Sequence, residues 1–97
     1  MKAQRGNQTF EVWKISHDPP KEAWVVQCFE QGILEWSAVN EHILLFPRIF
    51  GGAAAIGFYL IKTDEKDFQA INSKRFHREF LVLLVREAKN FRKVLSI

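Results

Sequence analysis

The chain has 97 residues, of which 47% are hydrophobic and 26% are charged. This length is typical of one domain, and the composition excludes a wholly disordered chain because such chains are poor in apolar residues. The single cysteine excludes an internal disulfide framework and a thiolate-rich zinc site, and it fits a reducing compartment. Residues 1–14 have no apolar stretch behind their first basic residues, so we expect no secretory signal. We therefore expect a single cytoplasmic domain over residues 1–97.

The formal net charge of +3 is unevenly distributed along the chain. Residues 1–73 carry seven basic and nine acidic residues, whereas residues 74–97 carry seven basic and two acidic residues. The body is therefore mildly acidic and the C-terminal segment is basic, which is the clearest feature of the chain.

The first part of the chain contains segments rich in β-branched and aromatic residues, which favour strands. We expect strands over 9–16 and 23–30. The pair Pro19-Pro20 between them predicts a connection, because proline cannot donate a hydrogen bond to a sheet. A third strand over 33–36 would complete an antiparallel meander.

The middle of the chain has a more mixed pattern. Residues 37–46 resemble a short helix with Ser37 as its N-cap. Residues 51–57 are a run of small residues that lacks the spacing of a dinucleotide or phosphate-binding loop, so we expect a steric role, such as close approach of a helix. Strands are expected over 58–63 and 68–71.

The C-terminal segment gives the clearest periodic pattern. Residues 74–95 contain no Gly or Pro, and at about 100° per residue their apolar and basic side chains fall on opposite sides. Asn72 or Ser73 can cap the first turn. We therefore expect a long amphipathic helix over 73–95. It would pack on one face of a mainly antiparallel sheet of four to five strands, which is an α+β fold.

The seven basic residues of this segment fall on one arc of the predicted helix, and such an arc can neutralise nucleic-acid phosphates. The alternative is a solvated face without a function, since Lys and Arg are good helix formers. Two valines inside the arc favour cover by a partner or a second copy. The candidate partner or nucleic-acid contacts are Arg75, Arg78, Val82, Val85, Arg86, Lys89 and Lys93.

Two polar residues, His77 and Glu87, fall on the apolar side of the predicted helix. Each would need a partner if it were enclosed, and an enclosed carboxylate is a candidate acid or base. With Trp24 and Trp36 from the predicted strands, they form a candidate ligand pocket. The alternative is that both side chains reach solvent at the edge of the apolar face.

An enzyme is a further alternative. His17 and His42 each lie beside an acidic residue, and Cys28 is a candidate nucleophile. However, neighbouring residues of a strand point to opposite faces, and a mid-strand cysteine is more often a small buried hydrophobe. No HExxH or CxxC spacing is present. The sequence therefore assigns no catalytic residue, no metal ligand and no cofactor.

We interpret the chain as a non-enzymatic binding or interaction module that self-associates as a homodimer, with an unidentified ligand. Nucleic-acid binding through the basic helix is the first alternative, and a small histidine-based enzyme is the second. Residues 43–61 are long and apolar enough to be tested as a membrane span, but Pro47-Arg48 and Gly51-Gly52 interrupt them, so we expect no membrane role. A phage or mobile-element origin is a further hypothesis.

Overall fold

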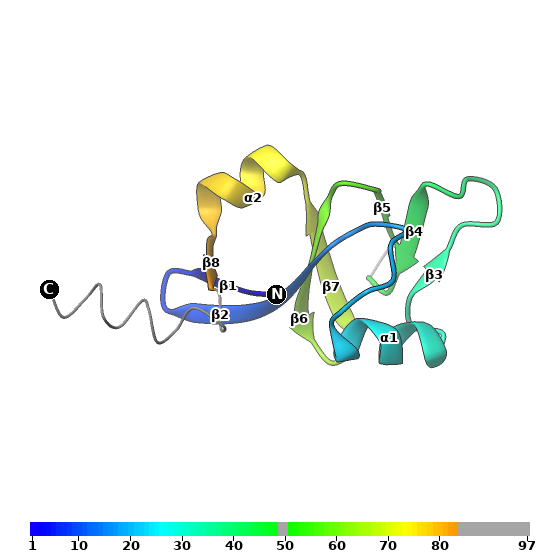
Figure 1. The fold of residues 1–97 in the computed structure, drawn as a ribbon, viewed down its shortest axis with the longest axis horizontal. Helices are drawn as coiled ribbons and strands as arrows, with labels where there is room; N and C mark the ends of the chain where they lie inside the picture. The colour runs from blue at the N-terminus through cyan, green and yellow to red at the C-terminus, as the bar shows by residue number, and fades with distance from the viewer. Residues whose placement is uncertain (49–50, 84–97) are drawn as a thin grey trace, which may run out of the picture.

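The computed structural model describes residues 1–48 and 51–83 (Figure 1). Within these ranges the chain forms two antiparallel sheets and two short helices. The strands are β1 (Lys2–Arg5), β2 (Gln8–Lys14), β3 (Glu35–Trp36), β4 (Ile43–Phe46), β5 (Gly52–Ala55), β6 (Tyr59–Asp64), β7 (Asp67–Ile71) and β8 (Leu81–Leu83). The helices are α1 (Ala23–Glu30) and α2 (Ser73–Glu79).

The larger sheet has five strands in the order β7-β6-β2-β1-β8, and the smaller sheet has three in the order β3-β4-β5. The fold is thus mostly β. The expected α+β arrangement, one sheet of four to five strands under a long C-terminal helix, is wrong.

Successive side chains of the five-stranded sheet point to opposite faces and enter two different cores. On β6, Leu60 packs in one core, whereas Tyr59 and Ile61 pack in the other. The first core lies between this sheet, α1 and the three-stranded sheet, while α2 covers the second core (Figure 1). Both faces of the sheet are therefore apolar, since α1 and the three-stranded sheet bury one face and α2 buries the other.

The helix expected over 73–95 begins as predicted but ends early. The side chain of its N-cap, Asn72, accepts a hydrogen bond from the Arg75 N–H at 2.8 Å, which satisfies one of the free donors of the first turn. α2 ends at Glu79 because Phe80 is extended, with φ −119° and ψ 146°. Within the described residues, the long helix predicted over 73–95 is therefore wrong, because it stops after two turns at Glu79.

The chain continues after α2 as the edge strand β8. It pairs antiparallel with β1, with Val82 opposite Ala3. A continuous helix would place Val82 on the solvated basic side, whereas the strand packs it against the second core and pairs its backbone with β1. Residues 84–95 of the expected helix lie outside the described residues.

The segment 23–30 is the helix α1, so the strand predicted there is wrong. Val25 and Cys28 are buried, and Trp24 and Phe29 pack beside them on the first core. These positions have the i, i+3, i+4 spacing of one helix face. Almost every residue of the segment is apolar, so its pattern fits the period of a helix and that of a strand. Packing against the two sheets selects the helix.

The helix expected over 37–46 is also wrong, because β4 occupies the end of this segment. The Ser37 hydroxyl does accept hydrogen bonds from the backbone N–H groups of Val39 and Asn40, at 3.2 and 3.3 Å. The capping pattern thus marks a turn between β3 and β4. In β4 every second residue is buried, which is the period of a strand.

The strands predicted over 9–16, 58–63 and 68–71 are confirmed with shifted ends, as β2, β6 and β7. The strand predicted over 33–36 is observed only as β3, and it pairs with β4, so the predicted meander is wrong. The small-residue run contains β5, and its steric role involves a neighbouring strand instead of a helix. Gly52 lies so close to the ring of Phe46 on β4 that an added Cβ would clash with it.

Candidate functional site

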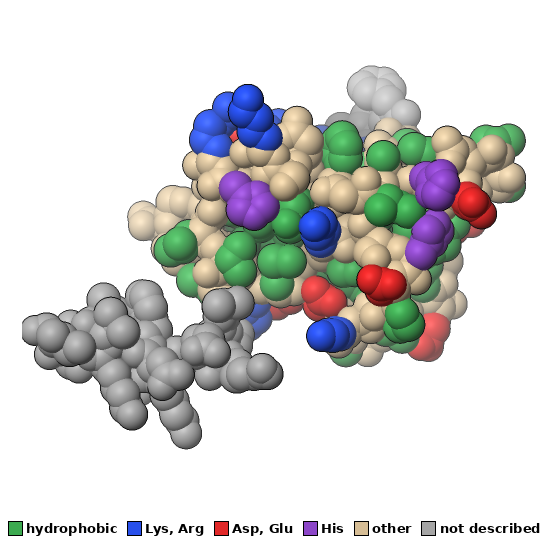
Figure 2. Space-filling model, turned by 45° about the horizontal axis from the view of Figure 1, so that its top comes forward, with side chains coloured by type: hydrophobic (Ala, Val, Ile, Leu, Met, Phe, Trp, Pro, Cys, Tyr) green, Lys and Arg blue, Asp and Glu red, His purple; other side chains and the backbone are tan. Residues whose placement is uncertain are grey.

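The described part of the predicted basic arc is a patch on α2. Lys74, Arg75 and Arg78 are exposed, and Figure 2 shows Lys and Arg side chains gathered over this helix. Arg75 Nε donates to Glu79 Oε2 at 2.6 Å, and Arg78 Nη2 lies 4.0 Å from the same oxygen. The Arg75 hydrogen bond is the main reason that the pKa of Glu79 lies below its ordinary value. This acid therefore offsets part of the positive charge of the patch.

Of the remaining predicted contact residues, the structure describes Val82 alone, and it does not lie on a helix. Val82 is half-buried in β8. Because α2 ends at Glu79, the described structure does not support a basic helix that carries seven cations. Val85, Arg86, Lys89 and Lys93 lie outside the described residues, as does Glu87.

The predicted ligand pocket is divided between the two cores. His77 is exposed on α2, with its ring centroid 5.7 Å from that of Tyr59 and its Nδ1 2.8 Å from the Ser73 carbonyl oxygen. Trp24 and Trp36 instead pack on the first core, which lies on the other face of the five-stranded sheet. The structure thus does not bring His77 together with the two tryptophans.

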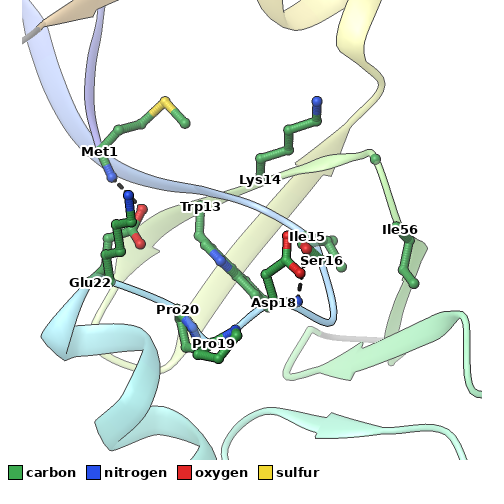
Figure 3. Close-up of a pocket in the computed structure, with 12 residues that line it drawn as sticks. Met1, Trp13, Lys14, Ile15, Ser16, Asp18, Pro19, Pro20, Glu22 and Ile56 are labelled. Carbon is green, nitrogen blue, oxygen red and sulfur yellow. Dashed lines mark hydrogen bonds and ion pairs between the residues drawn. The ribbon is translucent and has the colours of Figure 1, made fainter.

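A hollow of about 540 Å³ lies between the β2–α1 connection and the β5–β6 turn (Figure 3). The Pro19 and Pro20 rings lie along the connection, and Ile56 lies on the opposite side. The lining also includes charged residues of both signs: Lys14, Asp18, Lys21 and Glu22. The described lining residues include neither cysteine nor histidine.

Two histidines that are far apart in the sequence meet beside this hollow. The His17 ring centroid lies 4.2 Å from that of Trp36 and 6.0 Å from that of His42. His42 Nε2 lies 3.8 Å from Glu41 Oε1. Figure 2 shows two histidine side chains next to each other on one face, with an acidic side chain beside them.

The β5–β6 turn holds both histidine-bearing loops. Ile15, two residues before His17, donates its N–H to Phe58 and accepts from the N–H of Gly57, both at 2.9 Å. The carbonyl oxygen of His42 accepts from the N–H of Ile56 at 3.0 Å. In the sequence each histidine has only its neighbouring acid, Asp18 or Glu41, as an evident partner. The pair is created by tertiary contacts of two loops with one turn, and no spacing in the sequence indicates such contacts.

Cys28 does not provide a nucleophile for the histidines. Its side chain is 5% exposed within the first core, and burial raises the pKa of the thiol, against a smaller lowering by Lys62. The protonated thiol is a poor nucleophile. The buried hydrophobe expected from the sequence is therefore what the structure contains.

Within residues 1–48 and 51–83, no three His, Cys, Asp or Glu side chains are grouped so that they could hold a metal ion. Across the same ranges, no helix is long and apolar enough to cross a membrane. Comparison of the chain with protein-family models, curated proteins and solved structures finds no match.

Proposed function

We propose that the chain is a non-enzymatic interaction module that self-associates through the outer edge of β8. The observation that carries this proposal is the position of β8 at the edge of the five-stranded sheet. It pairs with β1 on one side, and among the described residues its other side has no strand partner. An edge strand of this kind presents free N–H and C=O groups to another chain.

The side chains of β8 support this role. All three are apolar, and Leu81 is 63% exposed. The strand contains neither the charged residues nor the proline that usually protect a sheet edge from pairing. In the sequence, Leu84 and Val85 extend the same apolar run to five residues. Such a run favours a paired edge over a solvated one.

A second copy fits this edge because antiparallel pairing of β8 with itself is self-complementary. A two-fold axis at Val82 would place Leu81 opposite the partner's Leu83, and Leu83 opposite the partner's Leu81. Leucines 81 and 83 share one face of the strand, so two cross-strand leucine pairs would form on that face. Isologous contacts of this kind close at a dimer.

The test is the molar mass in solution of the wild type and of two matched lysine variants. Leu81→Lys places a charge on the proposed interface, whereas Val39→Lys places one at a 96% exposed position in the β3–β4 connection. By multi-angle light scattering we expect a dimer for the wild type and for Val39→Lys, and a monomer for Leu81→Lys. Circular dichroism should show the same strand content in all three.

Two results would refute self-association at β8. One is a monomeric wild type throughout the micromolar range. The other is a folded Leu81→Lys variant that remains as dimeric as the wild type, which would place any dimer contact elsewhere.

Nucleic-acid binding is a second candidate because Lys74, Arg75 and Arg78 are exposed together on α2. Three cations would give a modest salt dependence, with log affinity falling by about 0.9 per phosphate contact for each unit of log salt. We expect Arg78→Glu to weaken binding of a labelled oligonucleotide, measured by fluorescence anisotropy. Lys66→Glu, in the exposed β6–β7 turn, should leave it unchanged. No binding by the wild type even at low salt would exclude this candidate.

A further inference from the structure

We propose that His17 and His42 form an exchangeable surface site for a divalent transition-metal ion, which binds copper(II) more tightly than nickel(II) or zinc(II). Imidazole nitrogen is a good ligand for these three ions, and copper(II) lies at the top of their affinity order. The site has two protein ligands, and water would fill the remaining positions.

The distance between the rings suits a shared ion. An ion bonded to one nitrogen of each imidazole at ~2.0 Å lies ~3.2 Å from each ring centroid, so two rings that share it have centroids ~4.5 Å apart for a right angle at the metal and ~6.4 Å apart for a straight one. The observed distance between the His17 and His42 centroids is 6.0 Å, with 58° between the ring planes. The separation of the rings therefore lies within the range that a shared ion allows, and rotation about the side-chain bonds would direct one nitrogen of each ring at it.

The His17 ring and the His42 backbone are held in place before an ion arrives. The His17 ring packs against Trp36 at 4.2 Å, and the His42 backbone is bonded to Ile56. A further hydrogen bond links the His42 N–H to Asn40 Oδ1 at 3.0 Å. Ligands that are already oriented lose less conformational entropy on binding, which raises the affinity of a two-ligand site.

The charge and the exposure around the pair also favour a cation. Glu41 Oε1 lies 3.8 Å from His42 Nε2, and a carboxylate beside one imidazole nitrogen makes the ring a better ligand through its other nitrogen. Both rings are exposed, and the His42 side chain keeps 65% of its accessible surface. Ions can therefore reach the pair from solvent and leave it again.

Copper(II) titration of the full chain tests this site, with the third histidine as a matched control. His77 is also exposed but lies on α2, against the other core. We expect calorimetry to give one ion per chain for the wild type and for His77→Gln. His17→Gln and His42→Gln should each weaken binding by roughly tenfold or more, because each removes one of two ligands.

Spectroscopy separates the proposed pair from adventitious copper. The electron paramagnetic resonance spectrum of the wild type should show coupling to two imidazole nitrogens, and each single variant should show one. Copper should also quench tryptophan fluorescence, since Trp36 packs against His17. The proposal is refuted if the folded double variant His17→Gln/His42→Gln binds copper as the wild type does, or if His77→Gln weakens binding as much as His17→Gln.

Discussion

The ring of Phe76 lies flat against the ring of Tyr59, with centroids 3.9 Å apart and planes 2° from parallel. Phe76 is completely buried, and it is the residue of α2 that enters the second core. Phe80 extends the stack, with its centroid 5.2 Å from that of Phe76. This contact holds α2 on the sheet and so sets where the chain turns into β8.

Phe76→Ala should therefore destabilise the fold strongly. Removal of a buried phenylalanine ring loses its transfer free energy and leaves a cavity, which lowers the free energy of unfolding by about 3–5 kcal/mol. Urea denaturation followed by circular dichroism measures this change. Arg78→Ala, at an exposed position of the same helix, should stay within about 0.5 kcal/mol of the wild type. Similar stabilities of the two variants would contradict the role given to Phe76.

Gly52→Ala should destabilise the three-stranded sheet. The added Cβ would overlap the Phe46 ring and lie 2.7 Å from the Phe46 carbonyl oxygen, so strand or ring must move. Overpacking of this kind lowers the free energy of unfolding by about 1–3 kcal/mol. Ala53→Ser changes the next residue, which is exposed, and should be nearly neutral. If Phe46→Leu relieves the clash, the double-mutant cycle with Gly52→Ala will show favourable coupling.

The Arg75–Glu79 contact predicts a pH dependence of stability. Its hydrogen bond lowers the pKa of Glu79 from the ordinary 4.5, so the contribution to stability is present above pH 4.5 and is lost as the pH falls through the lower folded pKa. Arg75→Gln should raise the Glu79 pKa, measured by NMR titration of its carboxyl carbon. Lys74 is a cation of the same helix, and it takes part in none of the ion pairs found among the described residues. Lys74→Gln should therefore change the Glu79 pKa much less. Equal shifts in both variants would contradict the hydrogen bond as the main cause.

The buried thiol predicts slow chemistry at Cys28. Burial raises its pKa above the ordinary 9.0, so the thiol should react more slowly with a disulfide reagent such as dithionitrobenzoate. We expect the reaction rate of the native chain to be lower than that of the denatured chain by a factor of roughly ten or more. The absorbance of the released thiolate measures both rates. A native rate close to the denatured rate would show an accessible thiolate and would reopen the nucleophile hypothesis.

The candidate site followed from the sequence only in part. The acidic neighbours of His17 and His42 drew attention to each histidine by itself, but nothing in the sequence places the two together. Their proximity arises from hydrogen bonds of two loops to one turn, and backbone contacts of this kind leave no spacing in the sequence. His77 carries the same side chain, yet it lies against the opposite core.

The sequence by itself determined the elements whose apolar pattern suits one period. Alternating β-branched and aromatic residues made β2 and β6 predictable, and Asn72 marked the start of α2, because these signals act within a few neighbouring residues. Tertiary structure decided between helix and strand in the segments where almost every residue is apolar. Residues 23–30 fit a strand or a helix, and residues 81–83 fit either as well, so local propensity does not separate the two states. The neighbours that were available to bury them, two sheets for α1 and the edge of β1 for β8, selected the observed state.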